Sequence, residues 1–396
     1  MRNNVAHLCH IFVINDKKYN FVEPNIMREM KKPDNLNNTL PCKTQLEALL
    51  AVASRKDEFV NNLRAAINEK EAEKRLMKHF GISQGQSQFL LNIPLSLFLS
   101  LTPENVQRGY NKVSKLIEQL TRKGEIKDYA DNRKMYLGEW ARRKGLDCYG
   151  LYRGIPYCHI LFLENDSKKL EVAKQNLLEG VNADLLEKIY EDKKLHTEAH
   201  HLNSSQLLCY NFFRPLIDKG LIAMLKEMGI EDIASIEKCE FEYTDGWDKW
   251  RSSKDETEFD FHICCKRTSG EDIEIFFEVK YTENEFTTKK ISESLSKKFD
   301  DVYKSRLDKA DCLYEKPADA KAFVGNYQLY RNAIRITDKN KYLVLLYPSG
   351  NKNVDEQANT FINGSIKDEY RDNVKIIHID KLPLQKEFGE KYFGVL

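Results

Sequence analysis

Alternating apolar and charged positions mark one hairpin about two-thirds of the way along the chain. Its strands are predicted at residues 257–265 and 273–281, joined by a polar turn around Ser269 and Gly270. Because side chains alternate between the two faces of a strand, Glu278 and Lys280 should point the same way. The pattern therefore predicts an antiparallel pair of strands that carries charges within an otherwise apolar sequence.

Three charged residues of this hairpin, Asp260, Glu278 and Lys280, are candidates for chemistry. Charge inside a β core costs free energy unless it is paired or holds a metal. A turn centred on Ser269 places Asp260 directly across from Glu278, with Cβ atoms roughly 5 Å apart. Two carboxylates that close repel each other unless a cation lies between them, and their oxygens suit a hard ion such as Mg²⁺.

The hairpin also has a plain structural interpretation, in which the charges lie on a solvated face of a half-exposed sheet. A slip of one residue in the register would break the pairing of Asp260 with Glu278. Glu258 is the main rival to Asp260, because it has the same parity on the strand.

The rest of the chain divides into two predicted domains. Residues 1–125 are expected to form a mainly helical domain that supports the rest of the chain, with a role in dimerisation or target recognition as the alternative. Ser83 could cap one of its helices, and Thr102-Pro103-Glu104 is a clear helix start signal. Residues 126–396 are expected to form an α/β domain with its core from about residue 200, and the apolar run 157–163 before that core is predicted to be a buried strand.

The order of elements in the second domain can be predicted from residue 205 onward. The pattern predicts a helix at 205–213 that Pro215 limits, and a second helix at 216–228. A strand at 236–243 precedes the hairpin, and a long polar helix with several lysines follows it. A helix at 327–332, a strand at 342–347 buried on both faces and a last strand at 374–379 complete the order.

Composition narrows the class of protein. The chain of 396 residues has a mean hydropathy of -0.58 and a net charge of +1, so any contact with nucleic acid must come from local patches. No apolar run approaches the roughly 18 residues that span a membrane, and the N-terminus lacks a secretory apolar region. We therefore expect a soluble, cytoplasmic protein with no membrane contact.

Cysteine and histidine residues give no strong metal motif. The nine cysteines have no CxxC spacing and are expected to be reduced. Cys264 and Cys265 are adjacent on the first strand of the hairpin and should point to opposite faces. His196 and His200 have a spacing that lets two side chains of a helix share zinc, but no second cluster completes a tetrahedral site.

The order helix, three-stranded meander, helix and buried strand resembles the core of PD-(D/E)XK nucleases. Residues 200–396 are similar to restriction endonucleases of that superfamily. The motifs that carry the resemblance are Asn203-Ser204-Ser205-Gln206-Leu207, Asn211-Phe212-Phe213-Arg214-Pro215-Leu216, Asp260, Glu278-Val279-Lys280 and Tyr327-Gln328-Leu329-Tyr330-Arg331-Asn332. Phe259 stands where the name-giving motif has proline, which changes little because the carboxylate is the ligand.

The resemblance implies a restriction-endonuclease-like core, a mixed sheet flanked by helices, and Mg²⁺-dependent hydrolysis of DNA, with Mn²⁺ as a possible substitute. Asp260, Glu278 and the backbone carbonyl of Val279 would bind the metal, and Lys280 would orient the attacking water. Some members place a further acid on the first helix. Gln206 is the nearest candidate here and Glu198 the runner-up, although Gln206 also fits a helix cap with Asn203.

Residues of the later helix supply the expected DNA contacts. Gln328 and Arg331 are three apart, so both could face the site and contact phosphate, or they could form a surface pair. The leading hypothesis is an endonuclease of restriction or host defence that acts as a homodimer, because each site cuts one strand. The alternatives are a non-catalytic DNA-binding or assembly module and an unrelated α/β scaffold.

Overall fold

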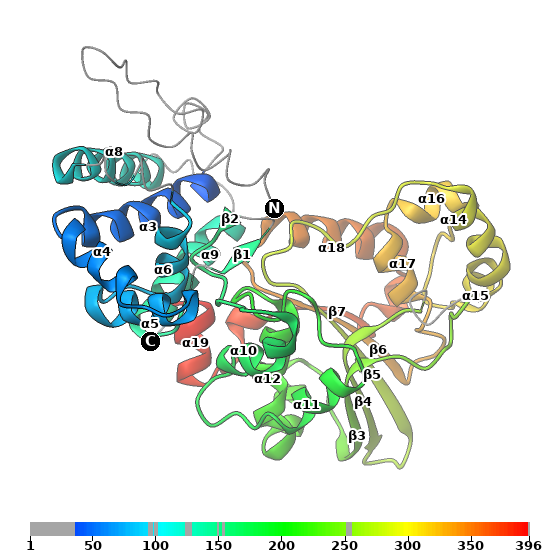
Figure 1. Ribbon diagram of the computed structural model, residues 1–396. Coiled ribbons are helices and arrows are strands. Elements are labelled where there is room, and N and C mark those ends of the chain that lie inside the picture. The colour runs from blue at the N-terminus through cyan, green and yellow to red at the C-terminus, as the bar shows by residue number, and fades with distance from the viewer. Residues whose placement is uncertain are drawn as a thin grey trace. The chain divides into compact units, whose positions relative to one another are not determined.

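The computed structural model describes residues 36–93, 98, 102–122, 129–148, 150–152, 155–250 and 256–394. The chain divides into two compact units, Met1–Val172 with His200–Leu202, and Ala173–Ala199 with Asn203–Leu396 (Figure 1). The domain boundary predicted at residues 125 and 126 lies outside the described residues.

The first unit is mainly helical in its described part. Its elements are α3 (Leu36–Ala53), α4 (Lys56–Arg64), α5 (Glu69–Phe80), α6 (Gln84–Leu91), α8 (Pro103–Arg122), α9 (Tyr129–Arg143), β1 (Leu151–Tyr152), β2 (Ile155–Pro156) and the 3-10 turn η1 (Asp166–Lys168). Phe59, Leu76 and Val106, which come from three different helices, lie in one buried apolar cluster. These helices therefore pack together because each one contributes an apolar face to the cluster.

Two predicted helix starts in this unit are confirmed. Ser83 caps α6 through a reciprocal pair of hydrogen bonds with Gln86, at 3.2 Å from the Gln86 N–H to Ser83 Oγ and 3.0 Å in return. Helix α8 begins at Pro103, as the Thr-Pro-Glu signal predicts.

The strand predicted at residues 157–163 is wrong. Only isolated bridges form in this segment, between Cys148 and Leu161 and between Ile160 and His201. Ile160 and Leu161 are buried, but a short buried apolar run does not need a partner strand along its whole length, and periodicity cannot distinguish the two cases.

The second unit contains the larger sheet and its covering helices. Its helices and turns are α11 (Asp184–Glu191), α12 (Ser205–Asp218), α13 (Leu221–Glu227), α14 (Glu293–Lys298), the π-helical η3 (Phe299–Tyr303), α15 (Lys304–Lys309), α16 (Ala320–Val324), α17 (Tyr327–Ala333), α18 (Lys352–Ser365), η4 (Asp368–Tyr370), η5 (Ile379–Lys381) and α19 (Lys386–Tyr392). Helix α10 (Lys169–Gln175) contains the point in the sequence where the two units divide.

Five strands form a mixed sheet in the order β3-β4-β5-β6-β7 (Figure 1). They are β3 (Ile233–Tyr243), β4 (Phe259–Arg267), β5 (Asp272–Val279), β6 (Lys341–Tyr347) and β7 (Val374–His378). The first three are antiparallel neighbours, and β6 and β7 then run parallel to β5. The predicted α/β class with a mixed sheet flanked by helices is confirmed.

The register of the hairpin is the one that a turn centred on Ser269 predicts. Phe261 of β4 pairs with Phe277 of β5, so Asp260 and Glu278 are the next positions along the two strands. Helices cover both faces of the sheet. The Phe213 ring of α12 stacks on Phe261 with centroids 4.2 Å apart, whereas residues of α17 and α18 join Phe276 in a second buried cluster.

Two expectations about helices in this unit are corrected. Pro215 lies inside α12 instead of limiting it, and α13 begins at Leu221. Because nearly every side chain before the proline is buried, packing outweighs the lost backbone hydrogen bond. The long polar helix is divided into α14, η3 and α15 by a π-helical segment at Phe299–Tyr303.

Among the described residues, no helix combines the length and apolar character that a membrane crossing requires.

Candidate active site

Glu278 lies at the end of β5 and accepts hydrogen bonds from α17 and from a lysine just after β5. Its Oε1 accepts hydrogen bonds from Lys280 Nζ at 2.8 Å and from Gln328 Nε2 at 2.8 Å. Its Oε2 accepts from Asn332 Nδ2 at 2.9 Å. Gln328 and Asn332 are one helical turn apart on α17, so this helix presents two amides to a carboxylate that is only 3% exposed.

Asp260 is held by the backbone of the neighbouring strand. Its Oδ2 accepts a hydrogen bond from the Val279 N–H at 2.6 Å, which places the carboxylate beside the end of β5. Its other oxygen accepts no hydrogen bond from any residue that the structure describes. Asp260 therefore has one fixed oxygen and one that is available to a ligand.

Burial and neighbouring charges change the pKa of Asp260. Burial and the negative charges of Glu278 and Glu242 raise the pKa of Asp260 well above its usual value, against the opposing charge of Lys280. A carboxylate whose pKa is raised by other carboxylates is one that a bound cation would stabilise. The direction of this shift is therefore compatible with a cation site beside Asp260.

Lys280 carries the positive charge of the group. Burial lowers the pKa of Lys280, but the charges of Glu278, Glu283 and Asp260 outweigh burial and raise the pKa above its usual value. The ammonium therefore stays charged while it lies almost buried beside two carboxylates. A fixed cation at this place is suited to offset negative charge on a phosphate.

A third carboxylate near Asp260 was missed by sequence reasoning. Glu242 of β3 is 2% exposed, and its backbone has a positive φ of 51°, which is uncommon for a residue other than glycine. The ligand atoms of His196, Glu242 and Glu258 lie within 4.8 Å of one another. Glu242 is one of three glutamates in β3, so no signal in the sequence singled it out.

His196 lies against this carboxylate and not beside His200 on a helix. Its Nε2 is 3.4 Å from Glu242 Oε2, and residues 197–200 form turns. Burial lowers the pKa of His196, but the hydrogen bond and charge of Glu242 raise it to about 9. The zinc-sharing helix that the spacing allowed does not form.

Gln206, the candidate from the first helix, bonds to backbone. Its Oε1 accepts from the His196 N–H at 2.9 Å, and its Nε2 donates to the Lys194 carbonyl at 3.0 Å. Gln206 thereby holds the segment that carries His196. Glu198, the runner-up, is exposed.

Arg331 lies on α17 but turns away from Glu278. Its Nη2 is 3.3 Å from Asp248 Oδ2, and its Nε donates to Thr257 Oγ1 at 2.9 Å. Asp248 also accepts from the Tyr303 hydroxyl at 3.1 Å. The structure thus brings Gln328 to the carboxylates and holds Arg331 in a separate buried network.

The donor set fits a hard divalent cation. Three hydrogen bonds occupy three of the roughly four lone-pair sites of the Glu278 carboxylate, and Asp260 keeps an oxygen without a donor. Carboxylate oxygens are the ligands that Mg²⁺ prefers. Asp260 and Glu278 could therefore hold such an ion with Lys280 beside it.

A family model described as Restriction Endonuclease associating with ARP matches residues 152–390, which is more than half of the chain. No curated protein and no solved structure matches the sequence. The matched span contains Asp260, Glu278 and Lys280.

Proposed function

The chain belongs to the family of restriction endonucleases associating with ARP, and we propose that it is a metal-dependent DNA endonuclease of the PD-(D/E)XK type. One observation carries this proposal. Asp260, Glu278 and Lys280 meet at the adjacent ends of β4 and β5, and two amides of α17 hold the Glu278 carboxylate. A solvated sheet face would not need such a set of partners around one acid.

Asp260, Glu278 and the backbone carbonyl of Val279 are the proposed ligands of Mg²⁺, with Mn²⁺ as a substitute. When bound, the ion lowers the pKa of a water molecule and stabilises charge on the phosphoryl oxygens. Lys280 orients that water and offsets charge on the scissile phosphate. Gln328 and Asn332 keep Glu278 in one orientation, as outer partners of metal ligands do.

Two further parts of the proposal concern DNA and the oligomeric state. Gln328 and Arg331 are proposed DNA contacts, and Gln206 is proposed to act by positioning the segment before α12. A homodimer would give one active site for each strand of duplex DNA. Sedimentation at micromolar concentration, with and without DNA, tests the dimer, and a monomer under both conditions would contradict it.

The test of activity is cleavage of mixed phage and plasmid DNA by the purified protein, with Mg²⁺ and with chelator. Glu278→Ala and Lys280→Ala are the test variants. Glu271→Gln is the matched control, because Glu271 is an exposed acid in the turn of the same hairpin. We expect discrete fragments that need the metal, that persist in Glu271→Gln and that are absent in both test variants.

The alternative is a non-catalytic DNA-binding or assembly module. DNA binding by the wild-type protein without any cleavage, across substrates and divalent ions, would favour that module. Cleavage that persists in Glu278→Ala would instead move the active site away from β5.

A further inference from the structure

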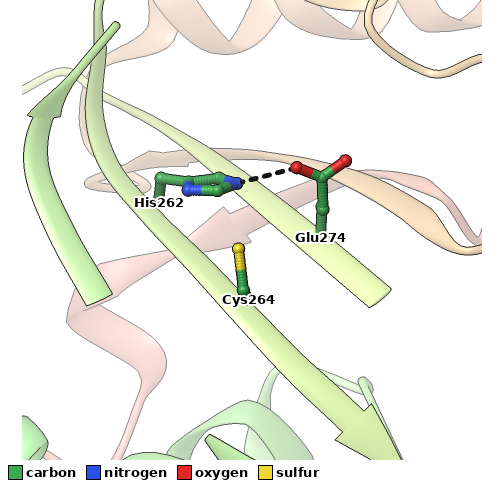
Figure 2. A group of neighbouring side chains, drawn as sticks. All are labelled: His262, Cys264 and Glu274. Atoms are coloured by element: carbon green, nitrogen blue, oxygen red, sulfur yellow. Dashed lines mark ion pairs between the residues drawn. The ribbon is translucent and has the colours of Figure 1, made fainter. Parts of the chain in front are cut away.

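A second group of potential metal ligands lies on the same hairpin, nearer the turn. It consists of His262 and Cys264 on β4 and Glu274 on β5 (Figure 2). Cys264 and Glu274 are direct cross-strand partners, and His262 is two residues from Cys264, so all three side chains share one face. Their ligand atoms all lie within 4.8 Å of one another.

His262 is the residue that needs explanation. It is 2% exposed, yet neither ring nitrogen makes a well-formed hydrogen bond to the described residues, and Nε2 has only the Glu274 carboxylate as a more distant ion-pair partner. Figure 2 shows the ring directed toward Glu274, and Nε2 lies 3.5 Å from Glu274 Oε1. A buried polar group without a good hydrogen bond costs about 1–3 kcal/mol, and a cation bound between the ring and Glu274 would offset that cost.

The ring is also fixed in place by aromatic neighbours. Its centroid is 3.9 Å from that of Tyr243 and 4.8 Å from that of Phe276, and both contacts are stacked. The imidazole therefore cannot turn easily to seek another partner. A ligand of fixed orientation favours metal binding because little order is lost when the metal arrives.

We propose that His262, Cys264 and Glu274 bind one divalent transition-metal ion of the zinc type. The group offers one nitrogen, one sulfur and one oxygen, a set that suits zinc and does not suit Mg²⁺. Three protein ligands leave a fourth tetrahedral position for water. The ion would join β4 to β5 at a position between the candidate active site and the turn of the hairpin.

The charges around the group are compatible with this assignment. Lys341 Nζ lies 3.5 Å from Glu274 Oε2, while Oε1 of the same carboxylate faces His262. On β3, Lys238 is the cross-strand partner of Cys264 and Glu240 that of His262, and these two form an ion pair of 2.6 Å. Binding breaks the S–H bond of Cys264, forms a metal–sulfur bond and releases one proton to solvent.

The proposed metal site is independent of nuclease activity, so metal binding to the full chain tests it directly. The full chain is stripped with chelator and titrated with Co²⁺ alone, and absorption from thiolate-to-cobalt charge transfer reports the cysteine ligand. Zn²⁺ is then added as a competitor. We expect one equivalent of Co²⁺ with a thiolate band that Zn²⁺ removes, and a Tm that rises with Zn²⁺.

Three variants and two controls locate the ion. Cys264→Ser should abolish the thiolate band, and Glu274→Gln and His262→Ala should weaken binding more than about tenfold, because loss of an outer partner alone costs that much. Cys239→Ser is the matched control, because Cys239 is a half-buried cysteine of the adjacent strand outside the group. Glu278→Gln should also keep the band.

Several results would overturn the assignment. Wild-type protein without a thiolate band would refute it, as would a band that persists in Cys264→Ser. Loss of binding in Glu278→Gln would place the ion at the candidate active site instead. If His262→Ala fails to fold, Glu274→Gln still decides the question, because it removes only the charge of a half-buried acid.

Discussion

Lys280 Nζ lies 2.8 Å from Glu278 Oε1, and the two side chains are 10% and 4% exposed. They are two residues apart at the end of β5, so the alternation of the strand places them on one face. A buried ion pair contributes little net stability, but removing one partner leaves a buried charge without compensation. Replacing one residue of the pair should therefore lower the free energy of unfolding more than replacing both.

The first prediction concerns folding of this pair. Lys280→Met should lower the free energy of unfolding by about 3 kcal/mol, because Glu278 loses its only cationic partner at hydrogen-bond distance among the described residues. The double variant with Glu278→Gln should recover most of that loss. Urea denaturation measures both. A Lys280→Met protein as stable as wild type would show that the pair is not coupled.

The second prediction concerns the amides of α17. Gln328→Ala and Asn332→Ala each remove one donor to Glu278, and each should raise the Mg²⁺ concentration for half-maximal cleavage about 10–100-fold. Asn359→Ala is the control, because Asn359 is an exposed amide on α18 that bonds to its own helix. An unchanged metal dependence in both test variants would remove these amides from the site.

The third prediction distinguishes Asp260 from its rival. Asp260→Asn should reduce cleavage by more than about a hundredfold, whereas Glu258→Gln should retain most of it, because only Asp260 is held against the Val279 N–H. Single-turnover cleavage rates measure the difference. Activity that survives in Asp260→Asn and is lost in Glu258→Gln would exchange the two roles. Glu242→Gln, measured in the same way, tests whether the third acid also takes part.

The fourth prediction concerns Arg331. Arg331→Gln should lower the free energy of unfolding by about 3 kcal/mol, because Asp248 is 1% exposed and loses its cationic partner. The salt dependence of DNA affinity tests the proposed phosphate contact separately. Loss of one contact should reduce the slope of log affinity against log salt by about 0.9, and an unchanged slope would restrict Arg331 to a structural role.

The fifth prediction is a pH dependence that comes from Lys391. This residue is fully buried, and Nζ donates to the Asn176 carbonyl oxygen and, at 2.7 Å, to Asn176 Oδ1. Burial lowers the pKa of Lys391 from 10.5 to about 7, against the opposing charge of Glu387.

The sign of this effect follows from the two pKa values. Below pH 7 Lys391 is protonated in both states, but between about 7 and 10.5 the unfolded chain binds more protons. The free energy of unfolding should therefore rise with pH in that window, by up to about 1.4 kcal/mol for each pH unit. Lys391→Met removes the effect. The free energy of unfolding of the wild type, measured relative to that of the variant by urea titration, should therefore increase from pH 7 to 8 to 9. A constant difference would contradict it.

Local pattern predicted the central geometry of the candidate site. The alternation of residues 257–265 and 273–281 and the turn around Ser269 set the register, which is confirmed by the pairing of Phe261 with Phe277. Such a prediction succeeds because strand period and turn position depend on neighbours in the sequence.

The end of one helix and the existence of one strand were predicted wrongly. Pro215 did not end its helix, because the side chains before it are buried and their packing outweighs one lost hydrogen bond. The run 157–163 did not become a strand, because burial of apolar residues does not specify β pairing. In both cases tertiary contacts outweighed a local preference.

The sequence by itself therefore determined which residues could do chemistry on the hairpin and how its two strands are aligned. Only the tertiary structure decided which side chains meet Glu278 from outside the hairpin. On α17 these are Gln328 and Asn332, and Arg331 bonds to Asp248 instead. The physical reason is that the rotation of a helix over a sheet is set by side-chain packing between distant segments, which residue spacing within the helix does not specify.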